Sequence, residues 1–225
     1  MRIVVLVAAV LLLAGCSESV SGQAQRSPEP SATSTTPPKP TTNSTVTSTV
    51  APAPPPKGAP MSAVVAWVEA GTPAEPADFH SAERDGDSTQ LGSDIAFVTA
   101  AGTQCMTDAT AAGALACLVQ LGDPPERPAD SYGEWKGGWV DFDGTTAQVG
   151  SAHADPGRFA KGTGALLGEG SSLRFGDYQC RDDAAGLLCV NYAHQSGVRL
   201  AETGVEPFGC LTPVDKPDAG LTFRC

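Results

Sequence analysis

Short apolar stretches alternate with turns rich in glycine, proline or aspartate from residue 94 to the end of the chain. Many of these stretches contain β-branched and aromatic residues, which favour strands. They are residues 94–99, 115–121, 138–142, 147–149, 173–178, 187–192, 198–200 and 221–223. The pattern predicts a mainly β domain, either a small sandwich or an irregular barrel of short antiparallel strands.

The segment that precedes these strands has a helical pattern instead. Val64, Trp67 and Val68 recur at the i, i+3, i+4 spacing of one helix face. Ser62 is a suitable N-cap and Gly71 a suitable stop, so the sequence predicts one short N-terminal helix that docks on a sheet. The polar, acidic residues 78–93 that follow are predicted to be mostly loop.

The N-terminus has the features of a bacterial lipoprotein signal. Arg2 precedes the uncharged run Ile3–Leu13, which is too short to cross a bilayer, since crossing takes about 20 apolar residues. The run ends in Leu-Ala-Gly-Cys, a lipobox. We therefore expect cleavage after residues 1–15 and a lipid on Cys16, which would hold the protein on the extracytoplasmic face of the cell membrane.

Residues 16–60 differ in composition from the rest of the chain. They consist mainly of Ser, Thr, Pro and Ala and contain no aromatic residue, so they cannot bury enough surface to fold. We interpret them as a disordered tether, stiffened by its proline runs. Such a composition is also typical of O-glycosylated stalks, which stays an open alternative. Residues 61–225 are then long enough for one exported domain.

Charge excludes one class of partner. The chain carries 25 acidic and 14 basic residues, a formal net charge of −11. Nucleic acid and anionic lipid headgroups attract positive surfaces, so nucleic acid is not an expected partner. The expected membrane contact is through the lipid on Cys16.

The cysteines other than Cys16 are expected to form disulfides, because an exported domain lies in an oxidising compartment. Two pairs flank turn-like stretches and could each staple neighbouring antiparallel strands, and the third would pin the C-terminus. The predicted pairs are Cys105–Cys117, Cys180–Cys189 and Cys210–Cys225. Metal or redox sites usually have cysteines about two to four residues apart, so no metal or other cofactor is expected.

The two internal pairs also echo each other. An apolar residue, Phe97 or Leu173, precedes a cysteine, a hairpin and a second cysteine in both places. This repetition is consistent with a duplicated, stapled hairpin.

At these residues the chain resembles exported lipoproteins of mycobacteria and other actinobacteria. The shared motifs are a strand with Gly-x-x-Cys, then Leu-x-x-Gly-x-x-x-Cys and Gly-x-x-Cys-x-Asn. Here they comprise residues 97–102, Cys105, Cys117, Leu173, Gly176, Cys180, Gly186, Cys189 and Asn191. Further matching stretches are Ser62–Pro73, Gly137–Thr145, Phe175–Cys180 and Asn191–Ser196. The resemblance implies a cell-envelope lipoprotein and transfers no catalytic residue.

Two motifs resemble loops of proteins that bind or process phosphate. Asp141-Phe142-Asp143-Gly144-Thr145 matches the Asp-x-Asp-Gly-Thr loop of haloacid-dehalogenase-type phosphatases, but no pattern of alternating strands and helices surrounds it. Asp-Gly is a common hairpin turn, and we interpret the motif as a turn. The glycines of residues 161–168 match no phosphate-binding fingerprint and predict a loop.

The remaining candidates are histidines and tryptophans. His153 or His194 could serve a hydrolase together with a carboxylate, although no Gly-x-Ser-x-Gly elbow accompanies them. Trp139 is expected to be largely buried, whereas Trp135 could be buried or could stack on a sugar.

The expected function is therefore a non-enzymatic module that binds an envelope protein or a glycan, with no catalytic residue assigned. The alternatives are an extracytoplasmic hydrolase that uses His153 or His194 with a carboxylate, and a surface protein without a small ligand.

Overall fold

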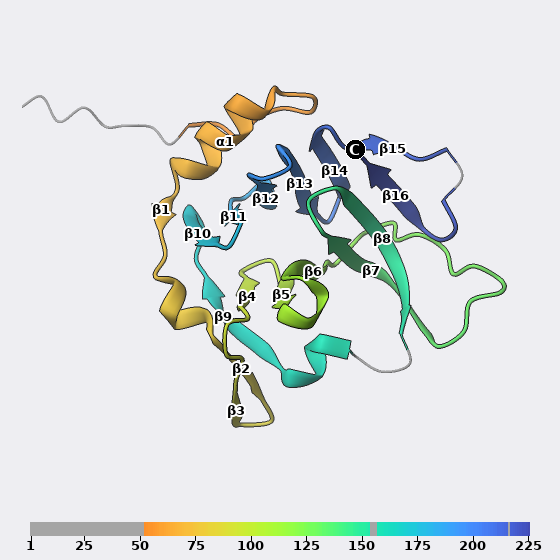
Figure 1. The fold of residues 1–225 in the computed structure, drawn as a ribbon, viewed down its shortest axis with the longest axis horizontal. Helices are drawn as coiled ribbons and strands as arrows, with labels where there is room; N and C mark the ends of the chain where they lie inside the picture. Colours follow the sequence, from red (N-terminus) through yellow and green to blue (C-terminus); the bar gives the residue numbers. More distant parts are fainter. Residues whose placement is uncertain (1–51, 154–156, 216) are drawn as a thin grey trace, which may run out of the picture. The chain divides into compact units, whose positions relative to one another are not determined.

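The computed structural model describes residues 52–153, 157–215 and 217–225 (Figure 1). The expected signal peptide, Cys16 and the tether up to residue 51 lie outside the described residues. Two β-sheets and one short α-helix, α1 (Met61–Glu69), make up most of the described chain, which confirms the mainly β class. No described helix combines the length and the apolar character needed to cross a bilayer.

The smaller sheet has six strands in the order β1-β10-β11-β12-β13-β14. Their bounds are β1 Thr72–Pro73, β10 Ser171–Phe175, β11 Tyr178–Arg181, β12 Leu187–Asn191, β13 Ser196–Ala201 and β14 Gly204–Gly209.

The larger sheet has ten strands in the order β15-β16-β8-β7-β6-β5-β4-β9-β2-β3. Their bounds are β2 Ser81–Arg84, β3 Asp87–Gln90, β4 Ala96–Thr99, β5 Gln104–Asp108, β6 Ala114–Leu118, β7 Glu134–Phe142, β8 Thr146–His153, β9 Thr163–Leu167, β15 Thr212–Pro213 and β16 Leu221–Arg224. Three 3-10 turns complete the described elements: η1 Pro76–Phe79, η2 Ala109–Ala111 and η3 Gly157–Lys161.

The two sheets face each other across one apolar core, so the fold is a sandwich. Alternate residues of facing strands point inward and pack together, as sheet-on-sheet packing requires. The larger sheet contributes Phe97, Cys105, Leu115, Cys117, Val140, Phe142 and Val149, and the smaller sheet contributes Leu173, Cys180, Leu187, Cys189, Val198 and Leu200.

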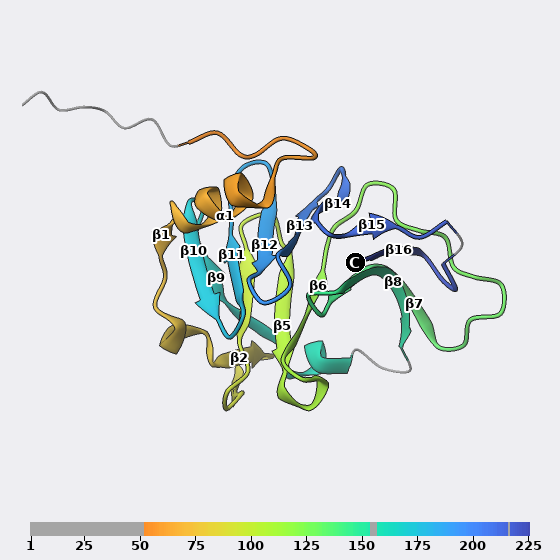
Figure 2. The ribbon, with the colours of Figure 1, turned by 45° about the horizontal axis from the view of Figure 1, so that its top comes forward.

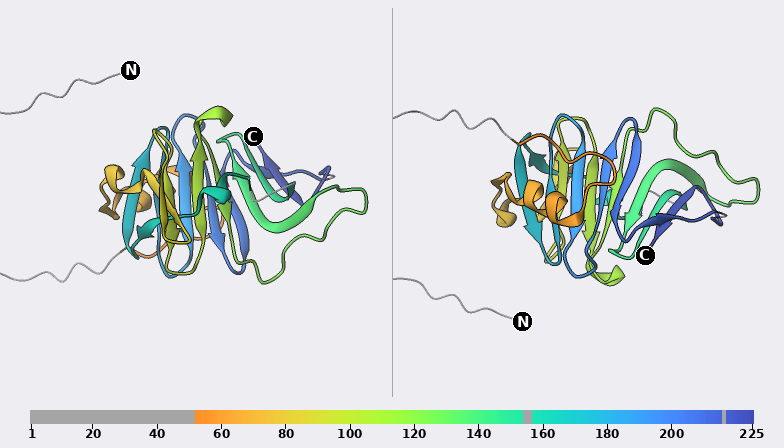
Figure 3. Two further views of the ribbon diagram at one scale, coloured as in Figure 1. Left: turned by 90° about the horizontal axis from the view of Figure 1, so that it is seen from below. Right: turned by 90° about the horizontal axis from the view of Figure 1, so that it is seen from above.

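Both outer faces are partly covered as well. Trp67 and its neighbours on α1 pack on Leu188, Val190 and Phe208 of the smaller sheet. Figure 2 shows α1 lying over the strands of this sheet. On the opposite face, Phe159 of η3 packs against Trp139 of the larger sheet. The left view of Figure 3 shows η3 in front of the strands of the larger sheet. Every residue of β12 is therefore buried, which explains why its first four residues, 187–190, form a continuous apolar run without alternation.

Each sheet contains the same five-stranded antiparallel meander. The first meander is β4 to β8 and the second is β10 to β14. In both, an apolar residue, two disulfide-bonded cysteines and a valine lie directly opposite one another on four successive strands. These positions are Phe97, Cys105, Cys117 and Val140 in the first meander, and Leu173, Cys180, Cys189 and Val198 in the second. The repeated sequence pattern is therefore matched by the structure, because equivalent residues are paired in the same register in both meanders.

The segments that lead into the two meanders are exchanged between the sheets. The lead segment α1–β1 precedes the first meander, but β1 pairs in parallel with β10 of the second. The lead segment η3–β9 precedes the second meander, but β9 pairs in parallel with β4 of the first. These parallel pairs were not part of the expected antiparallel pattern, because the partners are remote in sequence and β1 has only two residues.

The predicted loop at residues 78–93 is largely wrong, because it contains the β2–β3 hairpin. The turn at Asp85 and Gly86 has positive φ at both residues, the geometry of a type I′ hairpin turn. All side chains of β3 are exposed, so the hairpin shows no apolar alternation from which a strand could be predicted.

Three disulfides are present: Cys105–Cys117, Cys180–Cys189 and Cys210–Cys225. These are the pairs that the sequence predicts. The first two each join residues that lie directly opposite on neighbouring strands. Disulfides persist in oxidising compartments, so they indicate an extracytoplasmic location.

Candidate functional site

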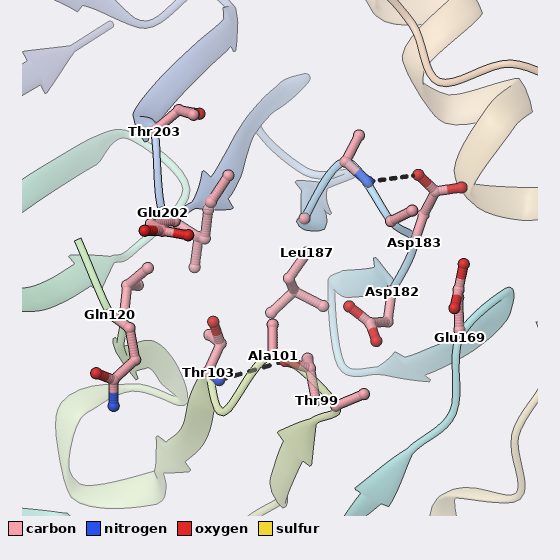
Figure 4. A pocket seen from close by; sticks show the side chains of 17 residues that line it. Thr99, Ala101, Thr103, Gln120, Glu169, Asp182, Asp183, Leu187, Glu202 and Thr203 are labelled. Atoms are coloured by element: carbon pink, nitrogen blue, oxygen red, sulfur yellow. Dashed lines mark hydrogen bonds between the residues drawn. The ribbon is translucent and has the colours of Figure 1, made fainter. Parts of the chain in front are cut away.

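A cavity of about 590 Å³ opens at one end of the sandwich, and we call it the end cavity (Figure 4). The β4–β5 turn contributes Thr99–Ala101 and Thr103, and the β11–β12 loop contributes Asp182–Gly186. The β9–β10 turn contributes Glu169, and the residues after β6 contribute Gln120. The β13–β14 turn contributes Glu202 and Thr203. Loops from both meanders therefore form one site.

The β11–β12 loop has a defined shape. Asp183 accepts a hydrogen bond on Oδ1 from the amide of Ala185 at 2.8 Å, and the Asp183 carbonyl accepts one from the Gly186 amide at 2.9 Å. Gly186 has a φ of 108°, and a Cβ there would collide with the carbonyl oxygen of Leu200. Since the Cys180–Cys189 disulfide also closes the two strands, the loop is held at both ends.

The β4–β5 turn on the other side is held in a similar way. The carbonyl of Thr99 accepts a hydrogen bond from the Gly102 amide at 2.9 Å, and the Thr99 hydroxyl accepts one from the Thr103 amide at 3.3 Å. Gly102 has a φ of 82°, a left-handed conformation that glycine adopts without strain. The cavity therefore has preformed walls.

Asp182 is the most unusual residue of the end cavity, because it carries a carboxyl although the residue is only 4% exposed. Burial raises the pKa of this carboxyl from 3.8 to about 6, since a buried charge loses its hydration. The nearby carboxylates of Glu169 and Asp183 raise the pKa further, whereas backbone amides of Asp183 and Ala100 lower it in part. Asp182 therefore carries a costly negative charge at neutral pH.

The lining has one sign of charge. Four acidic residues contribute, Glu169, Asp182, Asp183 and Glu202, and none of the described lining residues is Lys, Arg or His. Buried apolar residues, including Leu187 and Leu200, form part of the lining between them. The described chain contains no cluster of three or more His, Cys, Asp or Glu side chains suited to a metal ion.

A smaller cavity of about 220 Å³ involves the equivalent loops of the opposite meanders, the β10–β11 turn and the β5–β6 loop. Thr107 occupies the register position there that Asp182 occupies in the end cavity, two residues after the first cysteine of its meander. Its hydroxyl donates to Asp94 Oδ1 at 3.1 Å and accepts from the Ile95 amide at 2.8 Å. The polar groups of Thr107 and Asp94 are thus hydrogen-bonded within the protein. The end cavity, in contrast, gathers four acidic side chains.

Of the two histidines considered for the alternative hydrolase, His194 is not among the described residues that line the end cavity. His194 lies between β12 and β13, where its backbone amide donates to Asn191 Oδ1 at 3.0 Å. His153 is the last residue of β8 and lies opposite Glu134, and its side chain is outside the described structure.

The Asp-x-Asp-Gly-Thr motif forms a hairpin turn, which confirms that interpretation. Asp143 Oδ1 accepts hydrogen bonds from the amides of Thr145 and Thr146, both at 2.7 Å, and from the Thr145 hydroxyl at 2.9 Å. The carboxylate that a phosphatase would use to handle a proton therefore stabilises the turn between β7 and β8.

Neither Trp139 nor Trp135 presents an exposed ring on which a sugar could stack. Trp139 is 2% exposed and packs edge-on against Phe159, with ring centroids 4.9 Å apart, as expected for a buried residue. Trp135 is partly buried and donates its indole N–H to the Pro125 carbonyl at 2.9 Å, and its ring lies so close to Gly150 that a Cβ there would collide with it. The exposed aromatic residue of this region is Tyr132, at 93%, which sequence reasoning did not single out.

Sequence reasoning also missed the end cavity. Asp182 and Asp183 directly follow a buried strand, within the turn-like stretch that the Cys180–Cys189 pair flanks. An acidic pair at the end of an apolar strand is the signal that could have identified them. No known protein family, no curated protein and no solved structure is found to match this chain.

Proposed function

We propose that this chain is an exported binding module, and that its end cavity binds a cationic group on an apolar stem, such as an arginine or lysine side chain of a partner protein. The observation that carries the proposal is the buried carboxyl of Asp182 in a cavity whose described lining holds four acidic residues and no basic one.

The energetics favour a cation over other ligands. A buried carboxylate interacts more strongly with an opposite charge than an exposed one does, because the surrounding dielectric is lower. A guanidinium or ammonium group near Asp182 would also relieve its repulsion by Glu169 and Asp183. The methylene stem of the ligand could lie against Leu187 and Leu200, as long cationic side chains do on apolar surfaces.

The lining supports binding more than covalent chemistry. Its described polar side chains are carboxylates, threonine hydroxyls and one amide, with no histidine, serine or cysteine among them. A general base paired with an activated nucleophile would need such groups within hydrogen-bond reach of each other.

Chemical-shift mapping by NMR with the peptide acetyl-Gly-Arg-Gly-amide tests the proposal. We expect saturable shifts of the amides of residues 100–103, 182–186 and 202–203 in the mature chain carrying Cys16→Ser. The expected Kd is on the order of 1 mM, which corresponds to about −4 kcal/mol. Asp182→Asn should weaken binding about tenfold, a loss of about 1.4 kcal/mol.

Asp177→Asn is the matched control, because Asp177 lines the smaller cavity and should leave the Kd unchanged. The peptide acetyl-Gly-Gln-Gly-amide lacks the cation and should cause no shift. Equal binding of the arginine peptide to the Asp182→Asn variant, or shifts outside the end cavity, would disprove the site.

We infer further that a lipid on Cys16 anchors the module to the extracytoplasmic face of the cell membrane. The lipobox and the resemblance to mycobacterial lipoproteins support this, and the disulfides agree with an exported domain. Metabolic labelling with an alkyne-bearing fatty acid should mark the wild-type chain and leave Cys16→Ser unmarked. Labelling of both chains would refute Cys16 as the attachment site.

A further inference from the structure

Residues 52–56, Pro-Ala-Pro-Pro-Pro, form a segment that we call the proline segment, and it lies against the folded domain. The indole N–H of Trp67 donates to the carbonyl of Pro52 at 3.0 Å. The guanidinium of Arg199 donates through Nη2 to the carbonyl of Pro55, and Pro55 is buried. Figure 2 shows the chain before α1 running back across the helix toward β13 and β14.

The two contacts match the repeat of a polyproline II helix. Consecutive prolines favour this conformation, because each ring fixes φ and each proline restricts the residue before it. The helix has about three residues per turn, so the carbonyls of residues 52 and 55 point to the same side. Proline lacks an N–H, so these carbonyls are the main polar groups through which such a segment can be recognised.

Both donors are held in place by other contacts. Arg199 forms an ion pair with Glu206 at 2.7 Å, and its guanidinium lies 5.3 Å from the centre of the Phe208 ring. On the other side, the guanidinium of Arg181 lies 4.0 Å from the centre of the Trp67 ring and donates to the Trp67 carbonyl at 2.6 Å. Preorganised donors lose little conformational entropy when they bind a ligand.

We propose that Trp67, Arg199 and Phe208 form a polyproline-binding site, and that the proline segment of the same chain is its resident ligand. Aromatic-lined grooves with hydrogen-bond donors are a general solution for binding Pro-x-x-Pro peptides, and Pro52 and Pro55 have this spacing. Gly58, with a φ of 73°, and a hydrogen bond from the Ala59 amide to the Pro56 carbonyl then turn the chain into α1.

Occupation by the chain's own segment has a defined consequence. The segment is joined to α1 by a few residues, so its effective concentration at the site is on the order of millimolar or higher. A free proline-rich peptide therefore binds poorly while the resident segment is in place. The site fixes where the tether leaves the domain. It becomes available to other ligands when the binding of the proline segment is weakened.

The indole N–H resonance of Trp67, assigned with Trp67→Phe, reports on the site in the mature chain carrying Cys16→Ser. Pro55→Ala removes the buried ring, and we expect faster hydrogen exchange of this indole by about tenfold, the equivalent of about 1.4 kcal/mol. Pro56→Ala is the matched control, because Pro56 is exposed and should change the rate less than about twofold.

Adding the peptide acetyl-Pro-Ala-Pro-Pro-Pro-Lys-amide then separates a binding site from a mere packing contact. The peptide should restore the slow indole exchange in Pro55→Ala and should leave the exchange rate of the wild-type protein unchanged. An indole whose exchange is insensitive to Pro55→Ala, or a peptide that fails to slow the exchange or acts equally on both proteins, would overturn the proposal.

Discussion

At the scale of single residues, Asp182 is the position where stability and proposed function oppose each other. Its register equivalent, Thr107, is a neutral residue whose hydroxyl is hydrogen-bonded within the protein. A carboxyl in the same place costs free energy when it is ionised, because burial disfavours the charged form. Retention of such a group is expected where a ligand interacts with it, which is the basis of the binding proposal.

Replacing Asp182 by Asn should therefore stabilise the protein at neutral pH, by up to about 3 kcal/mol, since the pKa rise from 3.8 to about 6 corresponds to about 1.4 kcal/mol per unit. A carboxyl whose pKa rises from 3.8 to about 6 on folding binds more protons in the folded state between these values, so wild-type stability falls as pH rises from about 4 to above 6. The advantage of Asp182→Asn should vanish below pH 4. Urea unfolding at pH 3.5, 5 and 7.5 measures it, and an advantage that is the same at all three values would contradict the account.

Residue-scale features differ in how far the sequence determines them. The disulfide pairs could be predicted, because each internal pair flanks a turn between two strands and only short loops need closing. The buried state of Asp182 could not, because its burial depends on the β4–β5 turn, which is remote in sequence. The same holds for the partial burial of Trp135, which depends on Pro125 and Gly150.

At the scale of elements, the stapled hairpins are the repeated unit of the fold. Each places a disulfide between directly opposed residues in the core, and each is followed by a strand that supplies an inward-facing valine. The strands with clear apolar runs were predictable, whereas β1 and the β2–β3 hairpin were not. The β1 strand has two residues, and β3 has no buried side chain, so neither has an apolar pattern.

Removing the disulfides one at a time, by double Cys→Ala substitution, should rank them by burial. Loop-closure entropy alone favours Cys210–Cys225 by about 0.2 to 0.5 kcal/mol over the other two pairs, since its loop is the longest. Cys105–Cys117 and Cys180–Cys189 are almost fully buried, so their loss also leaves a cavity, which costs on the order of 1 to 2 kcal/mol more. The midpoints of urea unfolding should therefore fall further for the two internal pairs. A larger fall for Cys210–Cys225 would contradict this ranking.

At the scale of the whole molecule, the exchanged lead segments make each half of the domain dependent on the other. The lead segment α1–β1 precedes the first meander but packs on the second, and η3–β9 does the reverse. Arg158 of η3 donates to the carbonyls of Met106 and Ala114, which fastens that lead segment to the first meander. The equal register of the two meanders and this reciprocal exchange are what an internal duplication would produce.

The domain should consequently unfold in one cooperative step, although it contains two meanders. The lead segment that precedes one meander covers the outer face of the other meander and pairs in parallel with its first strand. Unfolding of either half would therefore expose the other. Scanning calorimetry should give a calorimetric enthalpy equal to the van't Hoff enthalpy. Two resolved transitions would show that the halves are independent.

The central claim is that the end cavity is a ligand site for a cation beside Asp182, and the pKa of this carboxyl measures it most directly. The carboxyl carbon of Asp182 can be followed by NMR during a pH titration, with and without saturating acetyl-Gly-Arg-Gly-amide. We predict a pKa of about 6 for the free protein and a lower pKa for the complex, because a neighbouring cation favours the ionised form. An Asp182 pKa that the peptide does not change would contradict the account.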